Sequence, residues 1–230
     1  MASQECRIYG FVEQGTYPAD FLAGFFIMEK AMTRVILIRH GQTDWNRDKR
    51  YQGSADIPLN EHGREEAERL KQWVSCQKIG LVYSSDRKRT SEFARIAFEG
   101  FPIKEETAFR EMGFGVFEGL VYEEAMRRFP GQYSSWIEDP VSTVIPDAEN
   151  FFDFSRRVIA SFDKIVSEND GTTAAIVTHA GPIRVILSRI MKLDSIWDLK
   201  TDSGSIHIVE TGNGEGRVLV LNDTAYLKDE

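Results

Sequence analysis

A short apolar run, Val35 to Ile38, ends abruptly on the string Arg39-His40-Gly41. A β-branched run of this length is typical of a strand that is buried on both faces of a parallel sheet. Open α/β sheets bind their ligands at the carboxyl ends of such strands. We therefore expect Arg39 and His40 to line a crevice, where Gly41 lets the backbone turn and approach a bound group closely.

The same arrangement occurs a second time, much later in the chain. Residues 173–178 form another short apolar run, and His179 follows it just before Pro182, which is well placed to start a helix. A lone histidine in such a place is more often structural. Two histidines that end neighbouring parallel strands would instead face one crevice, and the repetition favours this interpretation.

The charge of the chain narrows the class of partner. With 230 residues, 42% of them hydrophobic, the chain can bury one large core, and one α/β domain is the simplest expectation. Its net charge of -8 argues against nucleic acid or an anionic membrane as a general partner. Residues 34–53 reverse this balance, because they carry five arginines and lysines against two aspartates. This patch predicts a small anion as the partner, although a solvated run of charges would look the same.

The first part of the chain is predicted to stand apart from the domain. Residues 1–31 contain the apolar run 21–28, which is too short to span a bilayer and lacks the cationic start of a signal peptide. We expect an appended extension that is dispensable for the following domain, residues 32–230. The only two cysteines, Cys6 and Cys76, are far apart and in no metal-ligand spacing, which favours a cytoplasmic location and gives no sign of a zinc site.

Three motifs in this chain point to one family. Residues 39–46 read Arg-His-Gly-Gln-Thr-Asp-Trp-Asn, which resembles the signature of the histidine phosphatase superfamily, also called the phosphoglycerate mutase-like family. A Ser-x-x-x-Arg string that starts at Ser85 places Arg89 where the family has a second phosphate-binding arginine. Residues 110–119 resemble the Arg-Glu-x-x-Phe-Gly-x-x-Glu-Gly segment of the phosphatase branch, in which Glu111 has the position of the proton donor. A carboxylate in a glycine-rich loop is also by itself a candidate general acid.

The resemblance covers about residues 33–222 and implies a three-layer α/β/α fold in which helices flank a mostly parallel central sheet. It implies an enzyme that acts on a small-molecule phosphate ester through a phosphohistidine intermediate. The catalytic residues that it implies are His40 as nucleophile, Arg39 and Arg89 as phosphate ligands, His179 as a further donor, and Glu111 as general acid and base. The predicted substrate-binding residues are Asn46, Gln52, Gly53 and Thr43. No metal ion or other cofactor is expected, because the arginines and a histidine supply the positive charge.

The branch of the family can be narrowed further. Residues 114–119 read Phe-Gly-Val-Phe-Glu-Gly where the mutase branch has a Tyr-Gly-Gly-Leu-type segment, so we prefer a phosphatase. Residues 110–120, with the Trp-x-x-Asp-Pro string at 136–140, look most like α-ribazole phosphatases and broad-specificity phosphatases. The expected substrate is a small phosphorylated metabolite of the α-ribazole phosphate, sugar phosphate or phosphoglycerate class.

Two alternatives stay open. Phosphoglycerate mutase-type phosphoryl transfer is the first of them. The second is a module that binds phosphate without reacting, because Phe93, Ala180 and Asn150 depart from the residues that the family usually has. The oligomeric state is open as well, with a homodimer as one option.

Between the motifs, the sequence predicts the remaining elements. Residues 121–129 favour a short helix that Pro130-Gly131 would break. Residues 133–149 then read as a long irregular lid, and Glu149 could contact the site. Two strand patterns joined by the glycine-rich stretch 212–216 predict a hairpin near the end of the chain.

Overall fold

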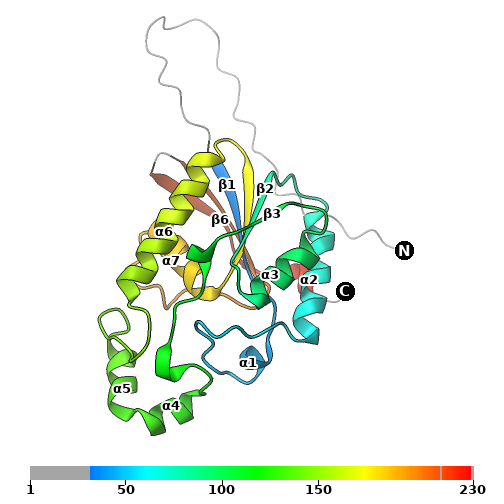
Figure 1. The fold of residues 1–230 in the computed structure, drawn as a ribbon. Coiled ribbons are helices and arrows are strands. Elements are labelled where there is room, and N and C mark those ends of the chain that lie inside the picture. Colours follow the sequence, from blue (N-terminus) through cyan, green and yellow to red (C-terminus); the bar gives the residue numbers. More distant parts are fainter. Residues whose placement is uncertain (1–31, 213, 229–230) are drawn as a thin grey trace, which may run out of the picture.

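The computed structural model describes residues 32–212 and 214–228, and a six-stranded sheet forms its centre (Figure 1). The strands are β1 Thr33–Arg39, β2 Leu81–Ser84, β3 Ile103–Glu105, β4 Thr173–Thr178, β5 Ile206–Gly212 and β6 Glu215–Asp223. They lie in the order β3-β2-β4-β1-β5-β6. The pairs from β3 to β1 are parallel, whereas β5 runs antiparallel to both β1 and β6. This mostly parallel sheet confirms the predicted fold class.

Helices cover both faces of the sheet and complete the three predicted layers (Figure 1). The long helices are α2 Glu61–Val74, α3 Lys88–Ala97, α6 Phe151–Glu168 and α7 Ala180–Met191. The shorter elements are α1 Asp44–Arg47, α4 Tyr122–Arg128, α5 Pro130–Glu138 and 3₁₀ turns at Thr107–Phe109, Gly115–Phe117 and Ala225–Leu227. Helices α6 and α7 lie on one face of the sheet, and α2 and α3 lie on the other.

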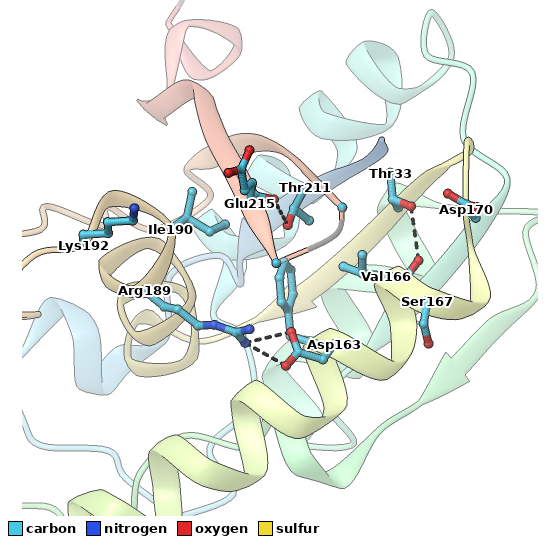
Figure 2. A pocket seen from close by; sticks show the side chains of 14 residues that line it. Thr33, Asp163, Val166, Ser167, Asp170, Arg189, Ile190, Lys192, Thr211 and Glu215 are labelled. Atoms are coloured by element: carbon cyan, nitrogen blue, oxygen red, sulfur yellow. Dashed lines mark hydrogen bonds and ion pairs between the residues drawn. The ribbon is translucent and has the colours of Figure 1, made fainter. Parts of the chain in front are cut away.

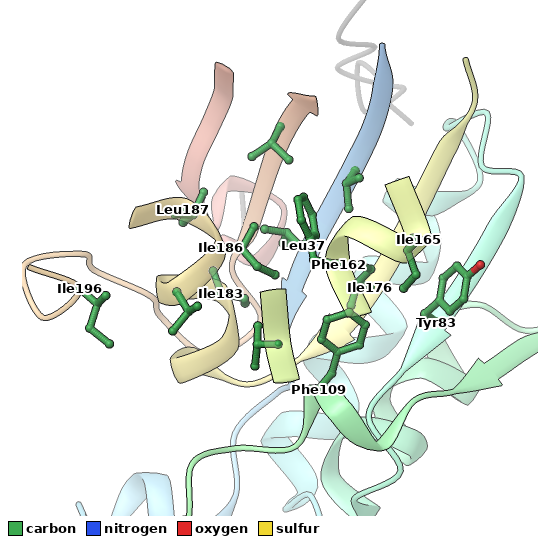
Figure 3. Packing of buried hydrophobic residues seen from close by; sticks show 14 of the residues in the cluster. Leu37, Tyr83, Phe109, Phe162, Ile165, Ile176, Ile183, Ile186, Leu187 and Ile196 are labelled. Carbon is green, nitrogen blue, oxygen red and sulfur yellow. The ribbon is translucent and has the colours of Figure 1, made fainter. Parts of the chain in front are cut away.

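The central strands supply side chains to two separate cores. Successive side chains of a strand point to opposite faces, so Leu37 of β1 and Ile176 of β4 pack under α6 and α7. Phe162 of α6 and Ile186 of α7 meet them there (Figure 3). All four side chains are at most 3% exposed. Burial of each contributes roughly 1.5–3 kcal/mol relative to exposure.

The opposite face explains why the apolar run in β1 is unbroken. Ile36 and Ile38 point into the core under α2 and α3, where Leu70 and Phe93 are fully buried. With both faces covered, β1 has no solvent-facing side, and polar residues gather where it ends. The local sequence therefore sets the position of the functional groups.

Helix α5 corrects the prediction of an irregular lid. The predicted short helix is α4, which ends at Arg128 just before Pro130 as expected. Pro130 is then the first residue of α5, because proline lacks only an N–H that this position does not need and its fixed φ suits the helix. Tyr133 and Trp136 of α5 are buried with Phe117 in a third apolar cluster. The irregular part is confined to residues 139–150.

The last two strands agree with the prediction, because β5 and β6 form the expected hairpin. Earlier in the chain, β3 is an edge strand that pairs with β2 alone among the described strands. The predicted extension, residues 1–31, lies outside the described residues. In the part of the chain that the structure describes, no helix combines the length and the apolar character needed to cross a membrane.

Candidate active site

The carboxyl ends of β1 and β4 bring the two predicted histidines together. These strands are parallel neighbours with Arg39 opposite Thr178, and the His40 N–H donates to the Thr178 carbonyl oxygen at 2.9 Å. His40 and His179 are the next residues on each strand. Their ring centroids are 5.1 Å apart at an interplanar angle of 67°. The side chains are 3% and 0% exposed, so two imidazoles share one buried crevice.

His40 is a neutral imidazole with a defined tautomer. Its Nδ1 lies 2.7 Å from the Gly41 carbonyl oxygen. Because a carbonyl oxygen can only accept, Nδ1 carries the hydrogen and Nε2 keeps its lone pair. Burial, together with the positive charges of Arg89 and Arg39, holds the pKa of His40 well below 6.5. At neutral pH the Nε2 lone pair is therefore available as a nucleophile.

His179 has the opposite tautomer. Arg89 Nε, which can only donate, lies 3.1 Å from His179 Nδ1, so the hydrogen of this ring is on Nε2. Nε2 is 3.0 Å from the Ser85 hydroxyl oxygen. Burial and then the positive charge of Arg89 hold the pKa of His179 well below 6.5. The single donor of this ring, Nε2–H, is therefore directed at the Ser85 hydroxyl oxygen, and its lone pair on Nδ1 accepts from Arg89.

Arg89 connects His179 to the loop that contains Gly53 and Ala55. It lies in the first turn of α3 and is completely buried. Its guanidinium donates to the carbonyl oxygens of Ala55 at 2.6 Å and Gly53 at 2.9 Å as well as to His179. Burial lowers the pKa of Arg89 to about 10, so the group stays positively charged at neutral pH.

Arg39 supplies a second buried cation. Its Nη1 donates to the Thr201 carbonyl oxygen at 2.5 Å, and its Nε has no partner among the described residues. Burial lowers its pKa, an effect that the negative charge of Glu111 partly opposes. An arginine with unused donors beside a cavity is suited to bind an anion.

Glu111 lies between two of the 3₁₀ turns and is held against α7. Its Oε1 accepts from the Met112 N–H at 3.0 Å, and its Oε2 accepts from the Gly181 N–H at 3.2 Å. Gly181 is in the first turn of α7, where the helix dipole favours a negative charge. A Cβ at position 181 would lie 2.1 Å from Glu111 Oε1, so this approach requires glycine.

Arg157 of α6 holds the loop that carries Glu111. It donates to the carbonyl oxygens of Ala108 at 2.6 Å, Arg110 at 2.9 Å and Glu111 at 3.2 Å. Glu149 binds Arg157 through both carboxylate oxygens at 2.7 Å each. Glu149 is not among the described residues that line the cavity beside His40. Glu149, whose contact with the site the sequence left open, reaches the loop of Glu111 through its pair with Arg157.

Of the residues described so far, Arg39, His40, Arg89 and Glu111 line a cavity of about 180 Å³. Its charged lining residues are Arg39, Arg50, Arg89, Arg184 and Glu111. Four cations against one carboxylate suit an anionic ligand. Of the predicted substrate-binding residues, Asn46, Gln52 and Gly53 line the cavity. Thr43 is not among its lining residues, because its hydroxyl caps α1 by accepting from the Asn46 N–H at 3.1 Å.

The sequence did not predict Arg184 and Trp197, which also line the cavity. A usable signal existed for Arg184, since it follows Ala180 by four residues and such residues share one face of a helix. Trp197 comes from the irregular connection between α7 and β5, where no periodicity places a side chain.

A larger hollow, about 550 Å³, opens at the other end of β1 (Figure 2). Its lining includes Arg189, which is paired with Asp163 at 2.7 Å, and Thr33 at the start of β1. None of its described lining residues is a histidine, and it lies at the amino ends of β1 and β4, away from the crevice. Among residues 32–212 and 214–228, no three or more His, Cys, Asp and Glu side chains are grouped to hold a metal ion.

Comparisons with known proteins agree with this geometry. A model of the histidine phosphatase superfamily (branch 1) matches residues 35–224. Phosphoserine phosphatase 1 of Hydrogenobacter thermophilus is 28% identical over 200 residues, which cover 85% of this chain and 95% of the relative. The metal-independent phosphoserine phosphatase of Arabidopsis thaliana is 28% identical over 205 residues, 87% of this chain and 85% of the relative. The crystal structure of the α-ribazole phosphatase from Shigella flexneri is similar with a TM-score of 0.75 and 28% identity, covering 83% of this chain and 96% of that one.

The matched residues contain both strand-end histidines and every charged residue that lines the cavity. The resemblance predicted from the three motifs is therefore confirmed over nearly the same range. The chain belongs to branch 1 of the histidine phosphatase superfamily, and it is a phosphatase with the phosphoglycerate mutase-like fold.

Proposed function

We propose that this phosphatase hydrolyses small phosphate monoesters without a metal ion, through a phosphohistidine formed on Nε2 of His40. The observation that carries the proposal is a pair of buried, neutral histidines of opposite tautomer, of which His40 lines a cavity together with several arginines. His40 keeps the lone pair that a nucleophile needs. The name of the metal-independent relative from Arabidopsis thaliana supports the same chemistry.

The first step transfers the phosphoryl group to the enzyme. Nε2 of His40 attacks phosphorus in line while the ester P–O bond breaks. Arg39 and Arg89 stabilise the charge on the equatorial oxygens, and His179 adds a hydrogen bond. Glu111 in its acid form gives its proton to the departing alcohol oxygen.

The second step releases phosphate. The carboxylate of Glu111 takes a proton from a water molecule, which attacks phosphorus as the P–N bond to His40 breaks. The electron pair of that bond returns to Nε2, and Glu111 regains the proton that it gave away. The fixed carboxylate position that Gly181 and Arg157 provide serves both steps, because the group must reach the leaving oxygen and the incoming water at nearly the same place.

The cavity favours a small alcohol. Its volume of about 180 Å³ lies below the roughly 300–1,000 Å³ of cavities that hold drug-sized ligands. Met112, Phe114 and Ile196 add apolar lining. Relatives are named for phosphoserine and for α-ribazole phosphate. The volume supports an ester nearer to phosphoserine in size.

Hydrolysis of p-nitrophenyl phosphate in the presence of EDTA tests the proposal directly. We expect the same kcat/KM with and without the chelator, because arginine and histidine side chains supply the positive charge. An activity that EDTA abolishes and that Mg²⁺ or Zn²⁺ restores would contradict the metal-independent route. Net transfer of phosphate to a second alcohol in place of water would support the mutase alternative.

The substitution Glu111→Gln should lower kcat/KM by different factors for substrates with different leaving groups. An alkyl phosphate such as glycerol 3-phosphate needs a proton on its departing oxygen, so its kcat/KM should fall by roughly 10²–10⁴-fold. p-Nitrophenolate leaves without a proton, so its kcat/KM, which reports only the first step, should fall much less. Its kcat should still decrease, because the second step loses its base.

The control for this experiment is Glu123→Gln, which removes an exposed carboxylate from α4. It should leave both substrates unaffected. Equal losses of kcat/KM for the alkyl and the aryl ester in Glu111→Gln would argue against a role of Glu111 as general acid.

A further inference from the structure

Arg184 is a cation in the cavity to which the proposed mechanism assigns no task. It lies on α7, one helical turn after Ala180 and Gly181, which line the same cavity. Its Nε donates to the Leu199 carbonyl oxygen at 2.9 Å, which fixes the guanidinium against the connection between α7 and β5. Neither terminal nitrogen of Arg184 donates to another described residue.

The described residues also provide no ion-pair partner for Arg184. Burial lowers the pKa of its guanidinium, and the nearby negative charge of Glu111 opposes this effect. A largely buried cation without a direct partner is unfavourable, and an anionic ligand would relieve that cost. The cavity can therefore accommodate a second negatively charged group, in addition to the phosphate assigned to Arg39 and Arg89.

Arg184 differs from the other two arginines in its contacts with the histidines. Arg39 precedes His40 in the chain, and Arg89 donates directly to His179, so these two arginines accompany the histidines. Arg184 contacts neither histidine and donates to the connection between α7 and β5, to which Arg39 also donates at Thr201. Ile196 and Trp197 of this connection line the cavity. Trp197 Nε1 is also buried without an acceptor among the described residues.

We propose that Arg184 binds a carboxylate of the substrate, so that the enzyme prefers phosphate esters of short hydroxy acids to those of simple alcohols. The inference rests on the proposed function, because it assumes that Arg39 and Arg89 hold the phosphate. A guanidinium binds a carboxylate through two parallel hydrogen bonds, which its two free terminal nitrogens allow. One helical turn, about 5.4 Å, separates Arg184 from the start of α7 beside His179. This separation suits an ester in which only a few atoms lie between phosphate and carboxylate.

O-Phosphoserine and O-phosphoethanolamine test the proposal, because they share the phosphate, the ester carbon and the ammonium group and differ only in the carboxylate. We expect the wild-type kcat/KM for O-phosphoserine to be roughly 10 to 100 times that for O-phosphoethanolamine, the range for a hydrogen bond to a charged group. Arg184→Gln should bring this ratio close to one, mainly through a loss with O-phosphoserine. Arg184→Lys should restore part of it. 3-Phosphoglycerate and glycerol 3-phosphate form a second such pair and should behave alike.

The matched control is Arg189→Gln, which removes one positive charge from the same helix. Arg189 is paired with Asp163 and is not among the described lining residues of the cavity, so the ratio should not change. Equal losses on both esters in Arg184→Gln, or a wild-type ratio near one, would overturn the inference and leave the proposed function standing. If the wild type hydrolyses neither these esters nor p-nitrophenyl phosphate, the proposed function itself fails and the inference with it.

Discussion

Replacing His40 with alanine should lower kcat/KM for every phosphate monoester by roughly 10⁴-fold or more. His179, the neighbouring imidazole, cannot take over, because its Nδ1 lone pair accepts from Arg89 and its Nε2 carries the hydrogen. The fold should persist, since the His40 ring hydrogen-bonds, among the described residues, only to the carbonyl oxygen of the adjacent Gly41. Loss of a partner for that buried oxygen should lower the free energy of unfolding by about 1–3 kcal/mol.

Capture of the phosphoenzyme checks this expectation. Enzyme mixed with a ³²P-labelled ester and quenched in alkaline detergent, which preserves phosphohistidine, should retain label in the wild type and none in His40→Ala. His62→Ala is the matched control, because His62 is an exposed histidine of α2 with a side chain that is 60% exposed. Its label and turnover should equal those of the wild type. Label retained by His40→Ala would place the phosphoryl group on another residue and contradict the proposed nucleophile.

The position of His40 could be predicted because the apolar run before it indicates a strand that is buried on both faces. An unbroken run such as Val35–Ile38 is stable only when both faces of its strand are covered, so the polar residues after it lie at a strand end. The repeat of this pattern before His179 predicted a second strand end. That β4 lies next to β1 did not follow from either run, since an apolar run fixes burial but not the order of strands.

Other parts of the site depended on contacts that no local pattern contains. Thr43 was predicted to bind substrate, yet it stands three residues before Asn46, and this spacing also describes the helix cap that the structure has. Arg184 and Trp197 reach the cavity through the docking of α7 and of the connection after it, a tertiary arrangement. Pro130 is a further example, because a proline can stand after the end of one helix or at the start of the next. The packing of Tyr133 in the third apolar cluster, which the local sequence does not show, stabilises the helix that starts at Pro130.

Replacing Arg89 with alanine should damage activity and stability together. The phosphoryl group would lose a charged donor, which should lower kcat/KM by roughly 10³-fold or more. The carbonyl oxygens of Gly53 and Ala55 and the Nδ1 of His179 would lose their donor in a buried site. Because unpaired buried acceptors are costly, while removal of a buried charge relieves some desolvation, the free energy of unfolding should fall by about 2–4 kcal/mol. Steady-state kinetics and urea unfolding measure the two effects.

Arg89→Lys distinguishes the charge from the geometry of the guanidinium. Lysine keeps the positive charge but offers no planar fork, so it cannot reach Gly53, Ala55 and His179 together. We expect Arg89→Lys to recover at most a small part of the lost kcat/KM and of the lost stability. The control is Lys88→Ala, which removes an exposed neighbouring cation 3.8 Å from Asp56 and should change neither quantity appreciably. Near-complete recovery of activity in Arg89→Lys would mean that positive charge alone suffices at this position, and would contradict a role for the shape of the guanidinium.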